Sequence, residues 1–327
     1  MNDAFSGDDA IAFQVGSDEA GERLDRLVAR KVTAGGRRKV SELFERGAVR
    51  VGGRVAKKGA VAREGDAVTV RLAPAIVAEN APLEVRLETP GVVVVEKPAG
   101  QPTVPARDGD EGTLASALLG RYPEMANVGY RLREPGLLHR LDTETSGLLV
   151  AARSTEAFAT LRAALSAGHI EKRYLAVVAA AGLPESGVVE AALAPDPRDG
   201  RRVLVLEGGA RPHHDGTGVQ GSPALEHDEV APGLRVTRFR KLRVAGPWAL
   251  VEIEARHAYR HQVRVHLASL GHPIAGDALY GGPAAGLAGQ RHALHASYVA
   301  WAGDDVVGAF AVESPLPDDL AALGFPR

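Results

Sequence analysis

The segment LHRLDTETSG, at residues 138–147, places one carboxylate among hydroxyl side chains. Asp142 is followed by threonine and serine residues, and Gly147 ends the segment. We interpret residues 136–141 as a strand and the polar residues after it as a turn. In such a turn a carboxylate often accepts backbone hydrogen bonds, as in an Asx turn. The residue types therefore leave two roles open for Asp142, a structural one and a catalytic one.

Several longer strings accompany this segment in a fixed order along most of the chain. The signature is HRLD at residues 139–142 followed by TSG at residues 145–147. The other strings are VVVVEKPAGQPTVP (92–105), KRYLAVV (172–178), HQVRVHLASLGHPIAGDALYG (261–281), RHALHA (291–296) and SPLPDDL (314–320). Together they resemble the motifs of RluA-type RNA pseudouridine synthases. The related small-subunit rRNA synthases usually have Gly-Arg-Leu-Asp, so His139 favours the RluA type.

The resemblance implies an isomerase that moves uracil from an N-glycosidic to a C-glycosidic bond on the same ribose. Substrate and product are isomers, so it implies no redox cofactor and no metal. Asp142 is the implied essential carboxylate, which either attacks the ribose or abstracts a ribose proton. Tyr174 is implied to pack against the uracil and to help move the C5 proton. Arg264 is the expected cation beside Asp142, because burial raises the pKa of a carboxyl group and a neighbouring cation opposes that rise.

The same resemblance indicates a set of substrate-binding residues: Arg140, His139, Lys97, Arg260 and Gln262. A stacked base must be extruded before it can react, and the planar guanidinium of Arg140 is suited to fill the vacated space. Each key residue also has a plainer interpretation. Tyr174 could be a core tyrosine on a strand, Arg264 a surface residue that contacts phosphate, and Lys97 part of a structural turn.

Two features depart from the family pattern. The family usually has Thr-Gly-Arg shortly before the His-Gln pair, whereas this chain has His257-Ala258-Tyr259. Arg260 is the candidate replacement for the missing arginine. Residues 207–233 are rich in Gly, Pro and His without periodicity, which predicts a long loop or an insertion.

The elements that must position these residues predict an α+β fold with a large, mixed, mostly antiparallel sheet and few helices. The expected strands are 83–87, 91–97, 136–141, 147–153, 173–180, 201–206, 234–242 and 248–255. The expected helices are 113–122, 154–167 and 261–270. Ser154 is a plausible cap for the second helix, and Gly168 and Gly271 follow the last two.

Residues 19–73, which we name the N-terminal module, predict two short helices and a basic hairpin. Apolar residues at helical spacing are Leu24, Leu27 and Val28, then Val40, Leu43 and Phe44. The hairpin turn is Gly52-Gly53. The strings RLDRLVARKV, RRKVSELFERGAVRVGGRV and REGDAVTV resemble the alpha-L RNA-binding module of small-subunit ribosomal protein four. The expected RNA contacts are Arg37, Arg38, Lys39, Arg50, Arg54, Lys57 and Lys58.

The domain prediction is an acidic flexible N-terminus at 1–18, the N-terminal module, a linker at 74–84 and a catalytic domain at 85–327. Charge supports an RNA partner despite a net value of −2. Residues 21–71 hold 14 Lys and Arg against 6 Asp and Glu, and residues 235–272 hold 8 against 2. Such basic blocks are typical of phosphate binding.

Composition excludes some classes of protein. There is no cysteine, which excludes disulfides, thiolate metal sites and a cysteine nucleophile. No stretch approaches the ~20 apolar residues that span a bilayer, and the acidic start does not resemble a leader peptide. We expect a cytoplasmic protein that has no membrane contact and acts as a monomer.

Two alternative functions and the choice of target RNA remain open from the sequence. A metallo-hydrolase would use His257 and His261, but residues 258–260 lack the Glu of an HExxH motif. A non-catalytic RNA-binding or ribosome-assembly factor could have the same fold. The target is the third open question: large-subunit ribosomal RNA is favoured, and transfer RNA is the alternative.

Overall fold

The computed structural model describes residues 10–32, 37–45, 47–71, 76–106, 109–131, 133–206, 211–213, 234–256, 259–287, 289 and 291–326. Within these residues no helix is both long enough and apolar enough to cross a bilayer. The chain forms two compact units. The first unit contains Met1–Pro82, Val104–Leu137 and Arg153–Thr155, and the second contains Leu83–Thr103, Leu138–Ala152 and Glu156–Arg327. The predicted domain boundaries otherwise stay a prediction.

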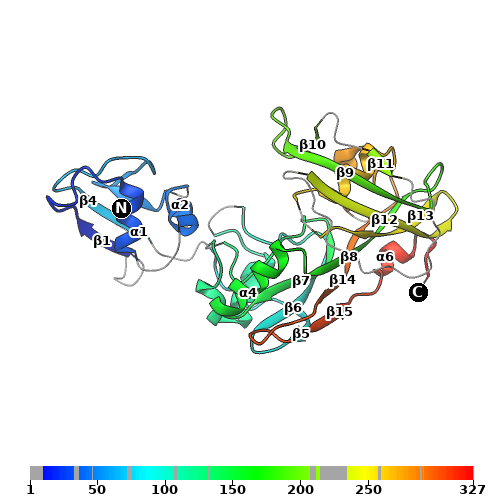
Figure 1. Cartoon of the computed structure of the whole chain (residues 1–327), viewed down its shortest axis with the longest axis horizontal. Coiled ribbons are helices and arrows are strands. Elements are labelled where there is room, and N and C mark those ends of the chain that lie inside the picture. The colour runs from blue at the N-terminus through cyan, green and yellow to red at the C-terminus, as the bar shows by residue number, and fades with distance from the viewer. Residues whose placement is uncertain are drawn as a thin grey trace. The chain divides into compact units, whose positions relative to one another are not determined.

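The second unit is built on one large sheet (Figure 1). Its strands are β5 (Glu84–Glu88), β6 (Val92–Lys97), β7 (Ser146–Ala152), β8 (Glu171–Ala179), β9 (Ser186–Pro195), β10 (Val203–Val205), β11 (Arg211–His213), β12 (Leu234–Ala245), β13 (Trp248–Glu254), β14 (Leu294–Trp301) and β15 (Phe310–Glu313). The order is β10-β9-β12-β13-β8-β14-β7-β6-β5, with β11 beside β9 and β15 beside β14. Among the described pairings only β14 with β7 is parallel, which confirms the predicted α+β fold.

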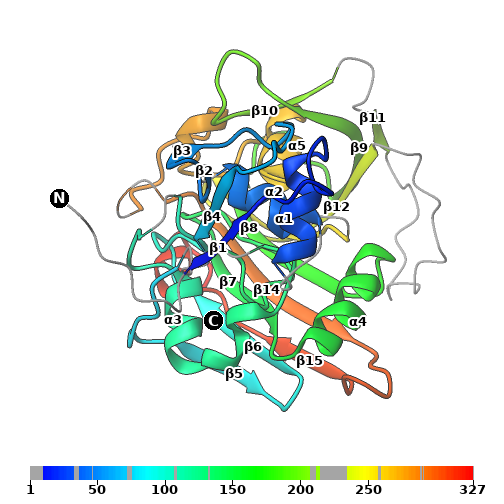
Figure 2. The same cartoon turned by 90° about the vertical axis from the view of Figure 1, so that its left-hand side faces the viewer.

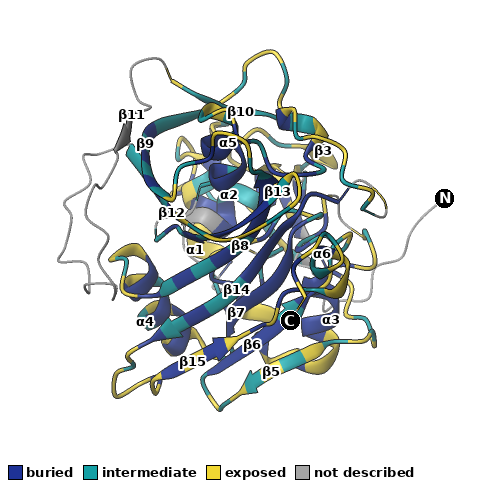
Figure 3. Cartoon of the chain, turned by 90° about the vertical axis from the view of Figure 1, so that its right-hand side faces the viewer, coloured by how far each residue is buried: buried dark blue, intermediate teal, exposed yellow. Residues whose placement is uncertain are grey.

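Strands β7 and β6, which lie next to the edge strand β5, are the most buried part of this sheet. All residues of β7 are buried, and β6 contributes four consecutive buried valines. Figure 3 shows these strands mostly in dark blue, beside β5. A strand that is covered on both faces reads as a continuous apolar run rather than an alternation. This explains why VVVV and GLLVAA predict strands without period-2 alternation.

The helices of the second unit are α4 (Thr155–Ser166), α5 (Gln262–Ser269) and α6 (Asp318–Ala321), with a 3-10 turn η2 (Ala278–Tyr280). Gly168 and Gly271, just beyond α4 and α5, have φ angles of 75° and 83°, the left-handed conformation that ends many helices. The two helices therefore occur where periodicity and glycine predict them. Helix α5 packs against β9, β10 and β12.

The first unit contains a four-stranded sheet in the order β1-β4-β2-β3 and, within the described residues, three α-helices (Figure 2). Its elements are β1 (Ala10–Gln14), α1 (Leu24–Lys31), α2 (Arg37–Glu45), β2 (Val49–Val51), β3 (Arg54–Val55), β4 (Ala67–Arg71), α3 (Leu114–Arg121) and η1 (Pro123–Asn127). The six predicted apolar helix residues are buried in one core. Thr113 caps α3 by accepting a hydrogen bond from the Ser116 backbone, near the predicted start of that helix.

The structure corrects two predictions. Residues 136–141 are not a strand: Thr103 Oγ1 exchanges hydrogen bonds with the backbone of Leu141, at 2.7 and 3.3 Å, in place of a strand ladder. Asp142 therefore lies ahead of β7 and not after a strand. Residues 10–14, within the predicted flexible N-terminus, form β1 and pair with β4. The predicted insertion at 207–233 lies outside the described residues except for β11.

Candidate active site

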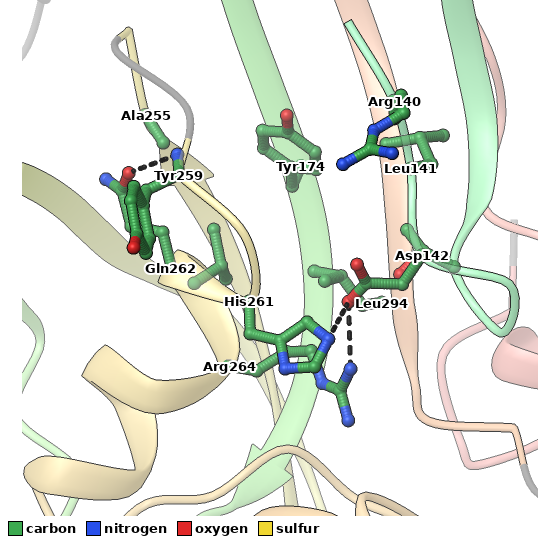
Figure 4. A pocket seen from close by; sticks show the side chains of 12 residues that line it. Arg140, Leu141, Asp142, Tyr174, Ala255, Tyr259, His261, Gln262, Arg264 and Leu294 are labelled. Carbon is green, nitrogen blue, oxygen red and sulfur yellow. Dashed lines mark hydrogen bonds and ion pairs between the residues drawn. The ribbon is translucent and has the colours of Figure 1, made fainter. Parts of the chain in front are cut away.

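A pocket in the second unit brings together side chains from four parts of the chain (Figure 4). The loop before β7, strand β8, the segment around the start of α5, and β14 all contribute. Its lining includes Arg140, Asp142, Tyr174, His261, Gln262 and Arg264. The three predicted catalytic residues therefore share one cavity, although Asp142 and Arg264 are 122 positions apart in the sequence.

Asp142 is held by a buried arginine. Arg264 Nη1 donates to Asp142 Oδ2 at 2.8 Å. The same guanidinium donates from Nε and Nη2 to both oxygens of Asp277, at 2.7 and 2.8 Å. The side chains of Arg264 and Asp277 are 8% and 1% exposed. A bidentate pair fixes the plane of a guanidinium, so Asp277 sets the direction from which Arg264 approaches Asp142.

This cluster keeps Asp142 ionised. Burial alone would raise the pKa of Asp142, but His261 and Arg264 more than compensate and leave the pKa below its usual value. Burial also lowers the pKa of His261, so this imidazole is neutral near pH 7. The lasting cation at neutral pH is therefore Arg264, whose pKa is raised by Asp277 and Asp142 against the effect of burial.

Tyr174 faces the same cavity from β8 and is buried. Burial, with a smaller contribution from the Asp142 charge, raises the pKa of its phenol to about 12. The hydroxyl is therefore protonated at neutral pH. Tyr174 can offer a flat apolar ring and an O–H donor, and it is not a phenolate base in the free protein.

The buried side chain of Lys97 anchors the loop that carries Asp142. The side chain of Lys97 is fully buried, and Nζ donates to the carbonyl oxygens of Pro98, Gln101 and Thr143 at 2.8, 2.7 and 2.9 Å. Three acceptors match the three N–H groups of an ammonium ion. Lys97 does not line the pocket. It thus ties residues 98–101 to the loop directly after Asp142.

Gly147 explains why the loop can pass so close to β14. Its φ is 115°, and a Cβ atom there would lie 2.2 Å from the carbonyl oxygen of Ala296. Only glycine fits both restrictions. Beside it, Thr145 Oγ1 hydrogen-bonds His292 Nε2 at 2.8 Å, and Ser146 Oγ bonds His295 Nδ1 at 2.9 Å. The TSG string thus joins the catalytic loop to β14 and to the residues just before it.

A family model described as RNA pseudouridylate synthase matches residues 91–269, more than half of the chain. The chain belongs to this family. The predicted RluA-type membership and the predicted enzyme class, an isomerase that acts on RNA, are therefore confirmed. The resemblance of the N-terminal module to the alpha-L module is not tested and stays a prediction.

Relatives in the family match almost the whole chain. An uncharacterized RNA pseudouridine synthase of Chloroflexus aurantiacus is 36% identical over 92% of this chain and 89% of its own length. Ribosomal large subunit pseudouridine synthase D of Xylella fastidiosa is 32% identical over 98% and 94%. The solved structure of human RNA pseudouridylate synthase domain containing 1 has a TM-score of 0.54 and 22% identity, covering 75% of this chain and 89% of that one. It shows the shared fold.

The predicted substrate-binding residues fall into different surroundings. Arg140 is exposed and lines the pocket. Gln262 also lines it, but its amide is bonded to the backbone of Tyr259 and Val236. Arg260 is directed away and donates to the carbonyl oxygens of Gly200 and Arg201.

His139 is not among the residues that line the pocket. Its Nε2 accepts a hydrogen bond from the Val150 backbone at 3.4 Å, and burial lowers its pKa to about 3. A neutral imidazole that accepts from β7 supports the loop rather than the substrate. His139 thus has a structural partner in the same strand that Asp142 precedes.

The predicted RNA contacts of the N-terminal module also differ among themselves. Arg50, Arg54, Lys57 and Lys58 are exposed. Lys39 is buried, and its Nζ donates to the carbonyl oxygen of Asn127 at 2.9 Å. The side chains of Arg37 and Arg38 lie outside the described residues.

Three residues in or beside the site were not singled out from the sequence: Asp277, His261 as a neighbour of Asp142, and Tyr280, whose hydroxyl lies 2.9 Å from His261 Nδ1. Asp277 lies in the string GDALYG, where an acidic residue directly before a short turn is a cap signature. Its side chain does accept from the Tyr280 backbone at 3.3 Å. That local signal could have drawn attention to Asp277. Its partner, 13 residues earlier, is visible only in three dimensions.

The metallo-hydrolase alternative required His257, which lies outside the described residues. Among the residues that the structure does describe, no group of three His, Cys, Asp or Glu side chains is arranged to hold a metal ion.

Proposed function

We propose that this enzyme converts specific uridines of large-subunit ribosomal RNA to pseudouridine, with Asp142 as the reacting carboxylate. The observation that best supports this proposal is the Asp142–Arg264 pair, at 2.8 Å, inside a pocket that also contains Tyr174. The choice of RNA rests on relatives such as the Xylella fastidiosa and Xanthomonas campestris proteins, both named ribosomal large subunit pseudouridine synthase D. Transfer RNA is the alternative target.

The reaction balances within one nucleotide. The N1–C1′ bond breaks, the C5–C1′ bond forms, C5 loses a proton and N1 gains one. Either route proposed for Asp142, attack on the ribose or removal of a ribose proton, requires a carboxylate. The lowered pKa of Asp142 provides that form at neutral pH. Arg264 engages Oδ2, so Oδ1 is the oxygen available for the reaction.

Tyr174 would then bind the extruded base, and Arg140 would fill the space that the base leaves. The Tyr174 ring offers a face on which an extruded uracil can stack, and its protonated hydroxyl can donate a hydrogen bond to the base. The exposed guanidinium of Arg140 lies on the rim, next in sequence to the loop that carries Asp142. From there it can occupy the space that the uridine leaves in the RNA stack.

The N-terminal module would contribute general RNA affinity. The four exposed cations on and beside its hairpin, Arg50, Arg54, Lys57 and Lys58, are placed to contact phosphates. We further propose that the enzyme acts as a monomer. Its proposed location is the cytoplasm, where ribosomal RNA is modified.

The test compares wild-type protein with Asp142→Asn on total cellular RNA and on ribosomal RNA transcripts. Pseudouridine is mapped in cells with and without the gene, and the same positions are then followed in vitro. We expect conversion at one or a few large-subunit sites, loss of conversion in Asp142→Asn, and unchanged RNA binding by that variant. Conversion confined to transfer RNA would support the alternative target. Absence of any conversion across the RNA panel would favour a non-catalytic RNA-binding factor.

A further inference from the structure

His261 has an unusual backbone conformation for its residue type. Its φ and ψ angles are 56° and 13°, in the left-handed region. Among the described residues it is the one non-glycine with a positive φ. Such a conformation is costly for a residue with a Cβ atom and persists where the surrounding structure enforces it. It turns the His261 ring from the start of α5 into the pocket (Figure 4).

The partners of the ring determine which nitrogen carries the proton. The Val203 backbone N–H donates to the Tyr280 hydroxyl oxygen at 2.8 Å. The same hydroxyl lies 2.9 Å from His261 Nδ1. With the Val203 N–H on one lone pair, the phenol uses its one proton when it donates to Nδ1. In that arrangement Nδ1 is an acceptor, and the proton of the neutral imidazole is on Nε2.

That Nε2–H group faces Asp142. Nε2 lies 3.7 Å from Asp142 Oδ2, the oxygen that also accepts from Arg264 Nη1. Figure 4 shows both contacts ending on the same oxygen, while the other carboxylate oxygen points away from them. Of the two groups, only Arg264 is hydrogen-bonded to Oδ2 in the free protein, because 3.7 Å is too long for a hydrogen bond from Nε2–H. Catalytic hydrogen bonds are often long before substrate binds and shorten in the complex. A second donor on Oδ2 would then restrict rotation of the carboxylate about its last bond.

We propose that His261, fixed as the Nε2–H tautomer by Tyr280, is a positioning residue that closes onto Asp142 Oδ2 in the RNA complex and so presents Oδ1 to the ribose. The inference rests on the role proposed above for Asp142.

The charged groups around His261 are consistent with a neutral ring. Asp142 and Asp277 favour the imidazolium form, whereas Arg264, Arg260 and above all burial disfavour it, so its pKa lies below the usual value. His292 is also nearby, and burial lowers its pKa to about 4. Near pH 7 the ring therefore acts through a single N–H group.

The first experiment compares His261→Gln with His261→Asn, after each variant has been checked for solubility and for an unchanged melting temperature. A glutamine amide can reach the position of Nε2, whereas an asparagine amide is too short. Asparagine, however, adopts the left-handed conformation more readily. Donation to Asp142 predicts that the single-turnover rate of His261→Gln stays within about threefold of wild type, while His261→Asn falls by about tenfold to a hundredfold, the scale of a misplaced reacting group. RNA affinity should not change in either.

A purely conformational role predicts the reverse order of the two variants, and that result would overturn the proposal. His169→Gln, at an exposed position shortly after the end of α4, is the control. Its rate should equal that of wild type.

The second experiment does not depend on activity. Protein labelled with ¹⁵N-histidine reports the tautomer of each ring by NMR, and the His261 signals are assigned by their loss in His261→Gln. We expect the Nε2–H tautomer in wild type and a mixture in Tyr280→Phe, with a slower single-turnover rate in the latter. An Nδ1–H ring in wild type would overturn the proposal. A wild-type enzyme with the expected tautomer and no conversion of any RNA would instead contradict the proposed function.

Discussion

In the unit that carries Asp142, the charged groups around the site are buried and paired, whereas in the N-terminal module the proposed RNA-binding cations are exposed. Arg264 and Asp277 are 8% and 1% exposed and are joined by two hydrogen bonds. Arg50 and Lys58 are exposed, and their hydrogen bonds go to a carbonyl oxygen and to a serine hydroxyl. Buried charges in a low-dielectric interior interact strongly and are sensitive to small displacements, while exposed ones are screened by salt.

The difference separates two tasks of an RNA-modifying enzyme. Orienting one carboxylate requires a fixed geometry, which desolvated ion pairs and hydrogen bonds supply. Gripping a phosphate backbone requires charge but tolerates movement. Substitutions in the two regions should therefore differ in kind: those near Asp142 should alter stability and rate, and those in the N-terminal module should alter the salt dependence of binding.

The largest effect is expected for Asp277→Asn. The substitution keeps the shape but removes the charge that balances Arg264, and breaking a buried pair by removing one partner costs about 3–5 kcal/mol. The free energy of unfolding, measured in urea, should fall by that amount, and conversion of RNA should fall because Arg264 no longer approaches Asp142 from a fixed direction. Asp199→Asn is the control, since its partner Arg201 is 81% exposed. Similar unfolding curves for the two variants would refute the distinction between buried and exposed pairs.

A smaller loss is expected for Lys97→Met, which removes three hydrogen bonds to the loops around Asp142. A buried acceptor left without its donor costs about 1–3 kcal/mol. Lys172→Met is a matched control: Lys172 is also buried, but its Nζ has no hydrogen-bond partner among the described residues. That variant should be as stable as wild type or more so. Equal destabilisation by both would mean that the carbonyl contacts of Lys97 contribute nothing.

The Lys97 comparison also has a pH dependence. Burial lowers the pKa of Lys97 to about 7, from an ordinary value of 10.5. Between these values the unfolded chain binds a proton that the folded chain does not, so stability rises with pH over this interval. The stability of wild type relative to Lys97→Met should therefore increase from about pH 7 upward, in urea titrations at fixed ionic strength. A flat difference would mean that Lys97 remains charged in the folded protein.

The sequence predicts much of the scaffold, because apolar spacing and glycine act locally. Leu24, Leu27 and Val28 are buried on one helix face as their spacing requires. The strand β14 was missed, since its buried His295 interrupts the apolar pattern and is satisfied only by Ser146 and Ser314, which lie far away in the sequence.

The site shows the same division between local and tertiary information. The motif strings identify Asp142, Tyr174 and Arg264 through the family resemblance, and the structure brings all three to one pocket. The partners that control their chemistry, such as Asp277, depend on contacts between distant segments. The segment GLLHRL at 136–141 predicted a strand, but side-chain hydrogen bonds of Thr103 with the Leu141 backbone replace the strand pairing there. A hydrogen bond from a distant side chain has no periodic pattern in the sequence that could predict it.

The smallest change in stability is expected from substitutions in the N-terminal module. Replacing Arg50, Arg54, Lys57 and Lys58 together by Gln removes four exposed cations and should leave the melting temperature unchanged. Each lost phosphate contact lowers the slope of log affinity against log salt by about 0.7–0.9, so four contacts lower it by about 3. The control is Arg23→Gln with Arg30→Gln, in the same module, because these arginines are already paired with Asp25 and Glu22. If both variants lower the slope equally, phosphate binding depends on the total charge of the module and not on its hairpin. If neither does, the N-terminal module does not contact the RNA backbone.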